Sequence, residues 1–160
     1  MEQLITKISS YNLFNYLLTG VVFVVFSSEF TTYNLFQENL FLNVILYYFI
    51  GLVISRLGSL IIEPVLKKIN FVKFAEYSQF IFASKKDPKV EILSESNNMY
   101  RTFCSVFLII IILKIFESLE IKLLITKTIS VYLLLVSLFI IFLYSYKKQT
   151  NYITKRIINL

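Results

Sequence analysis

Few residues in this chain of 160 could carry out chemistry. The sequence has no histidine, one cysteine and three glycines. An enzyme site needs a nucleophile, a base or a carboxylate pair in a recognisable arrangement, and no serine elbow, phosphate loop or paired carboxylates occur within the apolar segments. A zinc site would need histidine or several cysteines, and a calcium loop would need clustered acids with a glycine. We therefore expect no enzymatic activity and no cofactor or metal.

Charged residues that interrupt or flank apolar segments are the main candidates for function. A charge at membrane depth needs a partner or water. One interpretation is that Arg56 extends towards the interface or pairs with a carboxylate such as Glu63 or Glu95. The other is that such charges line a pore or pocket. The candidates for this role are Arg56, Glu63, Glu95 and Arg101. A membrane enzyme of lipid chemistry, a third hypothesis, would have to use the same four.

Two patterns predict helix packing. Small residues recur on one face of the second apolar segment, where they would let two helices approach closely. This small-residue face consists of Gly51, Ser55, Gly58 and Ser59. The first apolar segment carries a polar stripe, which we expect to bond to other helices or to line water. The polar stripe consists of Asn12, Asn15, Tyr16 and Thr19. Whether the small-residue face packs within the chain or between subunits stays open.

The composition places these residues in a membrane. With 57% hydrophobic and 16% charged residues, the chain is too apolar for a soluble domain. Four apolar segments are long enough, or nearly so, to cross a bilayer as helices, and they lack the alternation of barrel strands. They lie at about residues 12–28, 39–62, 99–118 and 128–146. The sequence therefore predicts an all-α polytopic membrane protein, with residues 1–160 forming one four-helix transmembrane domain.

The basic residues predict the orientation. When the third segment is taken as its charge-free core, residues 102–113, 12 of the 16 lysines and arginines precede the first segment, lie between the second and third, or follow the fourth. Only three lie in the other two connections, and Arg56 lies inside a segment. Cytoplasmic loops carry such an excess, so both termini should be cytoplasmic. Because the basic residues flank apolar segments and are not interleaved with exposed aromatic residues, we expect no nucleic-acid binding.

The connection 64–100 should form a small helical cytoplasmic layer. Apolar residues in its first half share one side of a helical wheel, which predicts a helix lying at the inner interface or packed on the ends of the spans. They are Phe71, Phe74, Ala75, Ile81 and Phe82. Asp87 followed by Pro88 predicts the start of a new helix that runs on into the third segment. Residues 150–158 should extend the fourth segment in the same way.

The small size, the scarcity of chemical groups and the inner face favour a non-enzymatic homo-oligomer that forms a pore or perturbs the membrane. A cytoplasmic protein or a small ligand would trigger it. In layout the chain resembles the small multi-span effectors of bacterial antiviral (anti-phage) defence systems, and this resemblance implies the bacterial inner membrane as its location. The alternative is an accessory or scaffold subunit that anchors a partner protein through residues 64–100.

Overall fold

The computed structural model describes the backbone of residues 2–158 and the side chains of residues 11–158. Over that range the chain is all-helical and contains no strand. The elements are α1 (Glu2–Phe30), α2 (Leu40–Leu57), the π-helical turn η1 (Gly58–Ile62), α3 (Glu63–Lys68), α4 (Tyr77–Lys86), α5 (Lys89–Lys122) and α6 (Lys127–Ile158). The predicted all-α class is confirmed.

Four helical stretches are long and apolar enough to cross a membrane. They are Tyr11–Phe30, Leu40–Lys68, Lys89–Lys122 and Lys127–Ile158. At 1.5 Å per residue, the 34 residues of α5 and the 32 of α6 extend about 50 Å each, compared with roughly 30 Å for a hydrocarbon core. Both helices are therefore long enough to project well beyond a bilayer.

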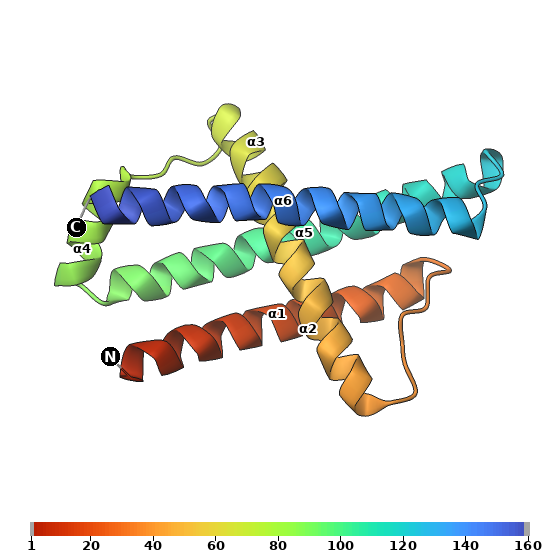
Figure 1. Cartoon of the computed structure of the whole chain (residues 1–160), viewed down its shortest axis with the longest axis horizontal. Coiled ribbons are helices and arrows are strands. Elements are labelled where there is room, and N and C mark those ends of the chain that lie inside the picture. The colour runs from red at the N-terminus through yellow and green to blue at the C-terminus, as the bar shows by residue number, and fades with distance from the viewer. Residues whose placement is uncertain (1, 159–160) are drawn as a thin grey trace.

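The helices do not form a bundle of near-parallel rods. In Figure 1, α1, α5 and α6 lie along similar axes, with α6 running opposite to the other two, and α2 with η1 and α3 crosses them steeply. The start of α1, the end of α6 and α4 lie together at one end of the molecule, which we call the tail end. The opposite end, where α5 passes into α6, is the loop end. The rod of 29 residues from α2 to α3 is about 44 Å long and fits a 30 Å layer only when tilted.

The backbones of α1 and α2 nearly touch where they cross. A Cβ atom placed on Gly20 of α1 would lie 1.8 Å from the carbonyl oxygen of Tyr47 in α2. A Cβ atom on Gly51 of α2 would lie 1.8 Å from the carbonyl oxygen of Tyr16 in α1. Each helix thus presents a glycine to the backbone of the other, and no larger residue fits at either position without separating them.

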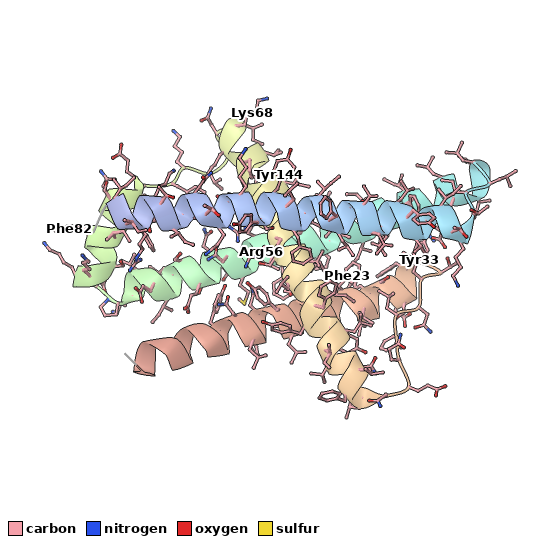
Figure 2. The ribbon with its side chains drawn as sticks, in the orientation of Figure 1. Phe23, Tyr33, Arg56, Lys68, Phe82 and Tyr144 are labelled. Carbon is pink, nitrogen blue, oxygen red and sulfur yellow. The ribbon has the colours of Figure 1, made fainter. Side chains whose placement is uncertain are left out.

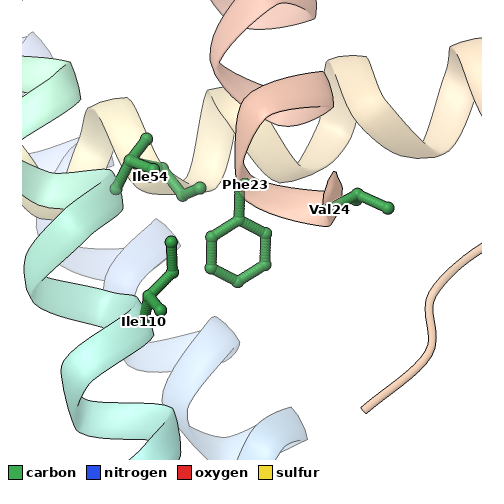
Figure 3. Close-up of a cluster of buried hydrophobic side chains, with 5 residues drawn as sticks. Phe23, Val24, Ile54 and Ile110 are labelled. Atoms are coloured by element: carbon green, nitrogen blue, oxygen red, sulfur yellow. The ribbon is translucent and has the colours of Figure 1, made fainter. Parts of the chain in front are cut away.

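The hydrophobic core is small and joins three helices. Phe23 and Val24 of α1, Ile54 of α2, and Val106 and Ile110 of α5 are buried against one another (Figure 3). Helix α6 packs on α2 and η1 instead, and none of its described residues is buried. The packed part of the chain therefore consists of α1, α2 and α5, with α6 attached at its edge.

The helix predicted for the first half of the connection 64–100 is only partly present. Helix α3 ends in a turn in which the Phe71 amide donates to the Leu66 carbonyl at 3.0 Å and Asn70 adopts a left-handed φ of 58°. Asparagine tolerates that conformation, which terminates helices. The chain then has no regular structure until α4 begins at Tyr77. Three of the five predicted residues therefore lie outside any helix: Phe71, Phe74 and Ala75.

The predicted long helix is confirmed. Helix α5 begins at Lys89, whose amide donates to the Asp87 carboxylate at 2.9 Å, and continues without interruption to Lys122. An acceptor at this place satisfies an amide that has no partner within the helix. Helix α4 precedes it and packs against it, with Ile81 buried. Helix α6 also continues to Ile158.

Candidate functional site

A buried carboxylate joins three helices towards the tail end of the molecule. Glu63 of α3 is only 7% exposed. Its carboxylate pairs with Lys67 Nζ at 2.9 Å, with Arg101 Nη1 of α5, and with Lys148 Nζ of α6 at 3.6 Å. A carboxylate taken out of water needs such partners, because its own desolvation is strongly unfavourable. We call these four residues the ionic cluster.

The three cations of the ionic cluster differ in their exposure to solvent. The Arg101 side chain is 18% exposed and that of Lys67 is 43% exposed. Lys67 lies one helical turn after Glu63, a favourable order for an acid and a base on a helix surface, but solvent weakens an exposed pair. Arg101 and Lys148, which is 25% exposed, are better shielded from solvent, and they tie α5 and α6 to the end of the α2–α3 rod.

The π-helical turn explains why Lys148 is held at this position. The Glu63 amide donates to Gly58 O, one residue further back than in an α-helix. Pro64 has no amide hydrogen, so the Ser59 carbonyl lacks both of the donors that lie four and five residues ahead of it. Lys148 Nζ supplies the missing hydrogen bond to Ser59 O at 2.6 Å and also contacts Ser59 Oγ at 2.7 Å.

A small cavity lies beside the ionic cluster, between the α2–η1 segment and α6. It has a volume of about 20 Å³, enough for one water molecule. Arg56, Ser59 and Lys148 line it, together with Ser145 and Tyr152. The hydroxyl of Ser145 is buried and has no hydrogen-bond partner among the described residues. This pocket, which we call the Arg56 pocket, thus combines positive charge with an unused polar group.

Arg56 pairs with neither of the two carboxylates that the sequence offered as partners. Glu63 is occupied by the ionic cluster, and no ion pair joins Arg56 to Glu63 or Glu95 among the described residues. Arg56 instead faces Tyr16, with 3.5 Å between Nη2 and the phenol oxygen (Arg56 is labelled in Figure 2). An unpaired charge inside a span costs about 2.5–3.5 kcal/mol on insertion scales, so this position favours an anion or water.

The other charged candidates are divided between two places. Glu63 and Arg101 meet in the ionic cluster. Glu95 does not join them; its backbone carbonyl accepts a hydrogen bond from the Tyr11 hydroxyl of α1. Arg56 belongs to neither place: it lines the neighbouring cavity with Lys148, and none of the described residues that line this cavity is acidic.

The small-residue face contacts three helices of the same chain. Gly51 lies against α1, Ser55 is buried, and a Cβ atom on Gly58 would meet Ser105 Oγ of α5 at 2.5 Å. Ser59 completes the set through its contact with α6. Small side chains at these positions let α1, α5 and α6 all approach the α2–η1 segment.

Most of the polar stripe of α1 faces the packed part of the chain. Asn15, Tyr16 and Thr19 are buried, whereas Asn12 is partly exposed. Thr19 Oγ1 donates to the Asn15 carbonyl at 2.6 Å, a bond within α1, and the Tyr16 ring packs edge-on against Tyr48 of α2 at 5.6 Å. The stripe therefore packs between helices, although its threonine bonds to its own helix.

A second cluster of polar side chains, at the loop end, joins the connection between α1 and α2 to helices α5 and α6. The Thr32 amide donates to the Glu117 carboxylate at 3.0 Å. The Tyr33 hydroxyl donates to Glu120 at 2.6 Å, and Ser130 donates to the same carboxylate. Partial burial raises the pKa of Tyr33 to about 12, and its hydrogen bond to Glu120 adds to the shift. The phenol therefore stays protonated near neutral pH and acts as the donor (Tyr33 is labelled in Figure 2).

No protein-family model matches the chain, and no curated protein and no solved structure is significantly similar to it.

Sequence reasoning missed several residues of these sites. Gly20, which completes the α1–α2 crossing, carried a signal, since it is one of three glycines and lies in an apolar segment. Glu117 and Glu120 carried a weaker signal, because two acidic residues near the end of an apolar segment are candidates for polar contacts. Lys148 carried none: it differs from Lys147 only in its position on the helix, and only packing distinguishes the two.

Proposed function

We propose that the protein is a non-enzymatic membrane effector that assembles from several copies and permeabilises a membrane when α6 is released from the α2–α3 rod. The observation that carries the proposal is the weak attachment of α6. None of its described residues is buried, although the helix is apolar enough to span a bilayer. Its exposed apolar surface needs lipid or another copy of the chain around it.

The contacts of α6 favour a helix that can separate as a unit. At the tail end it is held by Lys148, through Ser59 and Glu63. Along its length it meets α2 through the rings of Phe49 and Phe142, whose centroids are 6.1 Å apart. Polar attachments break more readily than a packed apolar core when a competing charge arrives, so the Lys148 contact is suited to a trigger.

The charge distribution supports a cytoplasmic trigger. We place the tail end, with both termini and α4, on the cytoplasmic side, because the loops and tails assigned there hold most of the lysines and arginines. The bilayer would be the bacterial inner membrane, as in the antiviral effectors that the chain resembles in layout. A small anionic ligand or an acidic surface of a cytoplasmic protein that binds Lys148 would then compete with Glu63 and Ser59 and free α6.

The test compares two neighbouring lysines of α6. The chain is expressed in a bacterium while a dye reports the membrane potential, and the purified particle is sized in detergent. We expect Lys148→Met to collapse the potential at expression levels that the wild type tolerates, and Lys147→Met, at an exposed position, to behave as the wild type does. We also expect particles larger than one chain for all three proteins.

Two results would contradict the proposal. One is a monomeric particle together with an intact potential for both variants. The other is an equal loss of potential for Lys147→Met and Lys148→Met, because a general effect of charge would then replace release of α6. Reporter fusions to each terminus test the orientation separately, and export of either terminus would contradict the cytoplasmic trigger.

One observation favours a second candidate function, an accessory subunit that anchors a partner protein. The connection after α3 exposes aromatic side chains outside the four spans: Phe71 is 75% exposed and Phe82 is 61% exposed. Such side chains in an aqueous loop are typical of an interaction surface. In this case a Phe71→Ser/Phe82→Ser variant would lose a co-purifying protein while the membrane potential stays unchanged with every variant.

A further inference from the structure

Two basic residues, Arg56 and Lys148, line the Arg56 pocket, and none of the described residues that line it is acidic. Lys148 pairs with Glu63 outside the pocket, whereas Arg56 forms no ion pair with a described residue. Among the described residues, the Arg56 guanidinium has one hydrogen-bond partner, the Tyr16 hydroxyl at a long 3.5 Å. Arginine presents five N–H donors in a planar fork that matches the oxygens of a phosphate. The pocket therefore presents donors that an anionic oxygen could accept from.

The remaining polar groups of the pocket could complete such a site. The Ser145 hydroxyl is buried without a partner among the described residues, and it lines the same cavity as Arg56. Tyr152 adds a phenol hydroxyl from the next turns of α6, and Lys148 lies 5.7 Å from the centre of its ring. Donors from both α2 and α6 thus face one small space.

The shape of the pocket distinguishes between a free anion and a headgroup. Its volume of about 20 Å³ admits one oxygen-sized group and not a whole phosphate. A phosphate would therefore place an oxygen inside and remain at the opening. Leu60 lines the same pocket, and Ile61 beside it is half exposed, so acyl chains have an apolar surface to follow. A phospholipid whose acyl chains contact this apolar surface does not need a cavity that encloses its whole headgroup.

We propose that the Arg56 pocket binds the phosphate of an acidic phospholipid, whose chains lie along the α2–η1 segment and α6. Basic pockets between membrane helices commonly take such headgroups. The lipid supplies the counter-charge that Arg56 lacks and bridges α2 to α6. This inference is independent of membrane permeabilisation, since a lipid could occupy the pocket in a monomer or in an assembly.

The experiment measures lipid binding to the purified full chain by native mass spectrometry. Phosphatidylglycerol and phosphatidylcholine are titrated in parallel, and inorganic phosphate serves as competitor. We expect one tightly bound phosphatidylglycerol per chain and weaker binding of phosphatidylcholine. Arg56→Gln should weaken phosphatidylglycerol binding about tenfold through loss of charge-assisted hydrogen bonds, with partial recovery in Arg56→Lys. Ser145→Ala, a small neutral change, should weaken it a few-fold.

Lys147→Gln is the matched control, because it removes one charge from the same end of α6 without touching the pocket. It should bind as the wild type does. An equal loss for Lys147→Gln and Arg56→Gln would overturn the proposal in favour of diffuse surface charge. Displacement of the lipid by millimolar inorganic phosphate would overturn the lipid assignment in favour of a free anion. Unchanged binding in both Arg56→Gln and Ser145→Ala would remove the site altogether.

Discussion

Replacing Gly51 by alanine should open the crossing between α1 and α2. The added Cβ atom would lie 1.8 Å from Tyr16 O and 2.8 Å from Thr19 Oγ1, whereas ordinary contacts begin near 3.4 Å. The clashing oxygen belongs to the backbone of a helix, so it cannot rotate away as a side chain would. The helices must therefore separate by roughly 1.6 Å at this point, which loosens the packing of Phe23, Val24 and Ile54.

The expected cost follows from two opposing effects. Overpacking of a close contact typically costs 1–3 kcal/mol, and a rigid backbone clash belongs at about 3 kcal/mol. Alanine is a better helix former than glycine by about 1 kcal/mol, which offsets part of this. The free energy of unfolding should fall by about 2 kcal/mol, equivalent to about 4–8 °C in Tm for a chain of this size.

Thermal unfolding in one detergent, followed by circular dichroism, measures the change. Gly20→Ala should show a similar fall, and the double variant should fall by less than the sum because both act on one contact. Gly58→Ala is the matched comparison: its Cβ atom would lie 2.5 Å from Ser105 Oγ, a side-chain atom that can move away when it gives up its hydrogen bond to the Arg101 carbonyl, so Tm should fall by less than in Gly51→Ala. A Gly51→Ala variant as stable as Gly58→Ala would refute the reasoning.

Three further predictions concern stability in the same assay. Glu63→Gln leaves buried cations without a counter-charge and should lower the free energy of unfolding by about 3–5 kcal/mol. Lys148→Met should cost less in the Glu63→Gln background than it costs in the wild type, and equal costs in the two backgrounds would exclude coupling between Glu63 and Lys148. Asn39→Ala removes the side chain that caps α2 at the amides of its first turn and should cost about 1 kcal/mol, so an unchanged Tm would contradict the cap. Leu124→Gly should stabilise by about 1 kcal/mol because Leu124 has φ 51°, whereas Leu123→Gly, at φ −96°, should not.

The ionic cluster and the π-helical turn act as one structural unit. Pro64 removes a backbone donor, the widened turn redirects another, and Lys148 from a different helix satisfies the carbonyl left over. The same lysine then reaches Glu63. An unsatisfied backbone carbonyl is costly wherever water is excluded, and most of all in lipid, so this hydrogen bond couples the shape of the α2–α3 rod to the position of α6.

Much of the architecture could be predicted from the sequence. Long apolar runs require backbone hydrogen bonds to be satisfied within the segment, so the four helices follow from composition alone. Asp87 and Pro88 also predicted the start of α5, because capping is a local property. The helix expected over residues 71–82 failed in its first half, since Asn70 ends α3 in a conformation that a helical wheel does not describe.

The sequence by itself determined the four long apolar helices and which of their residues are too polar for lipid. Only the tertiary structure decided which of these residues meet. Arg56 and Glu63 share a face of one segment, yet Glu63 pairs with Arg101 and Lys148, from helices far along the chain, and Arg56 faces Tyr16. The physical reason is that helix formation depends on neighbours within a few residues, whereas ion pairing depends on the crossing of helices, which Gly20 and Gly51 allow to be close and steep.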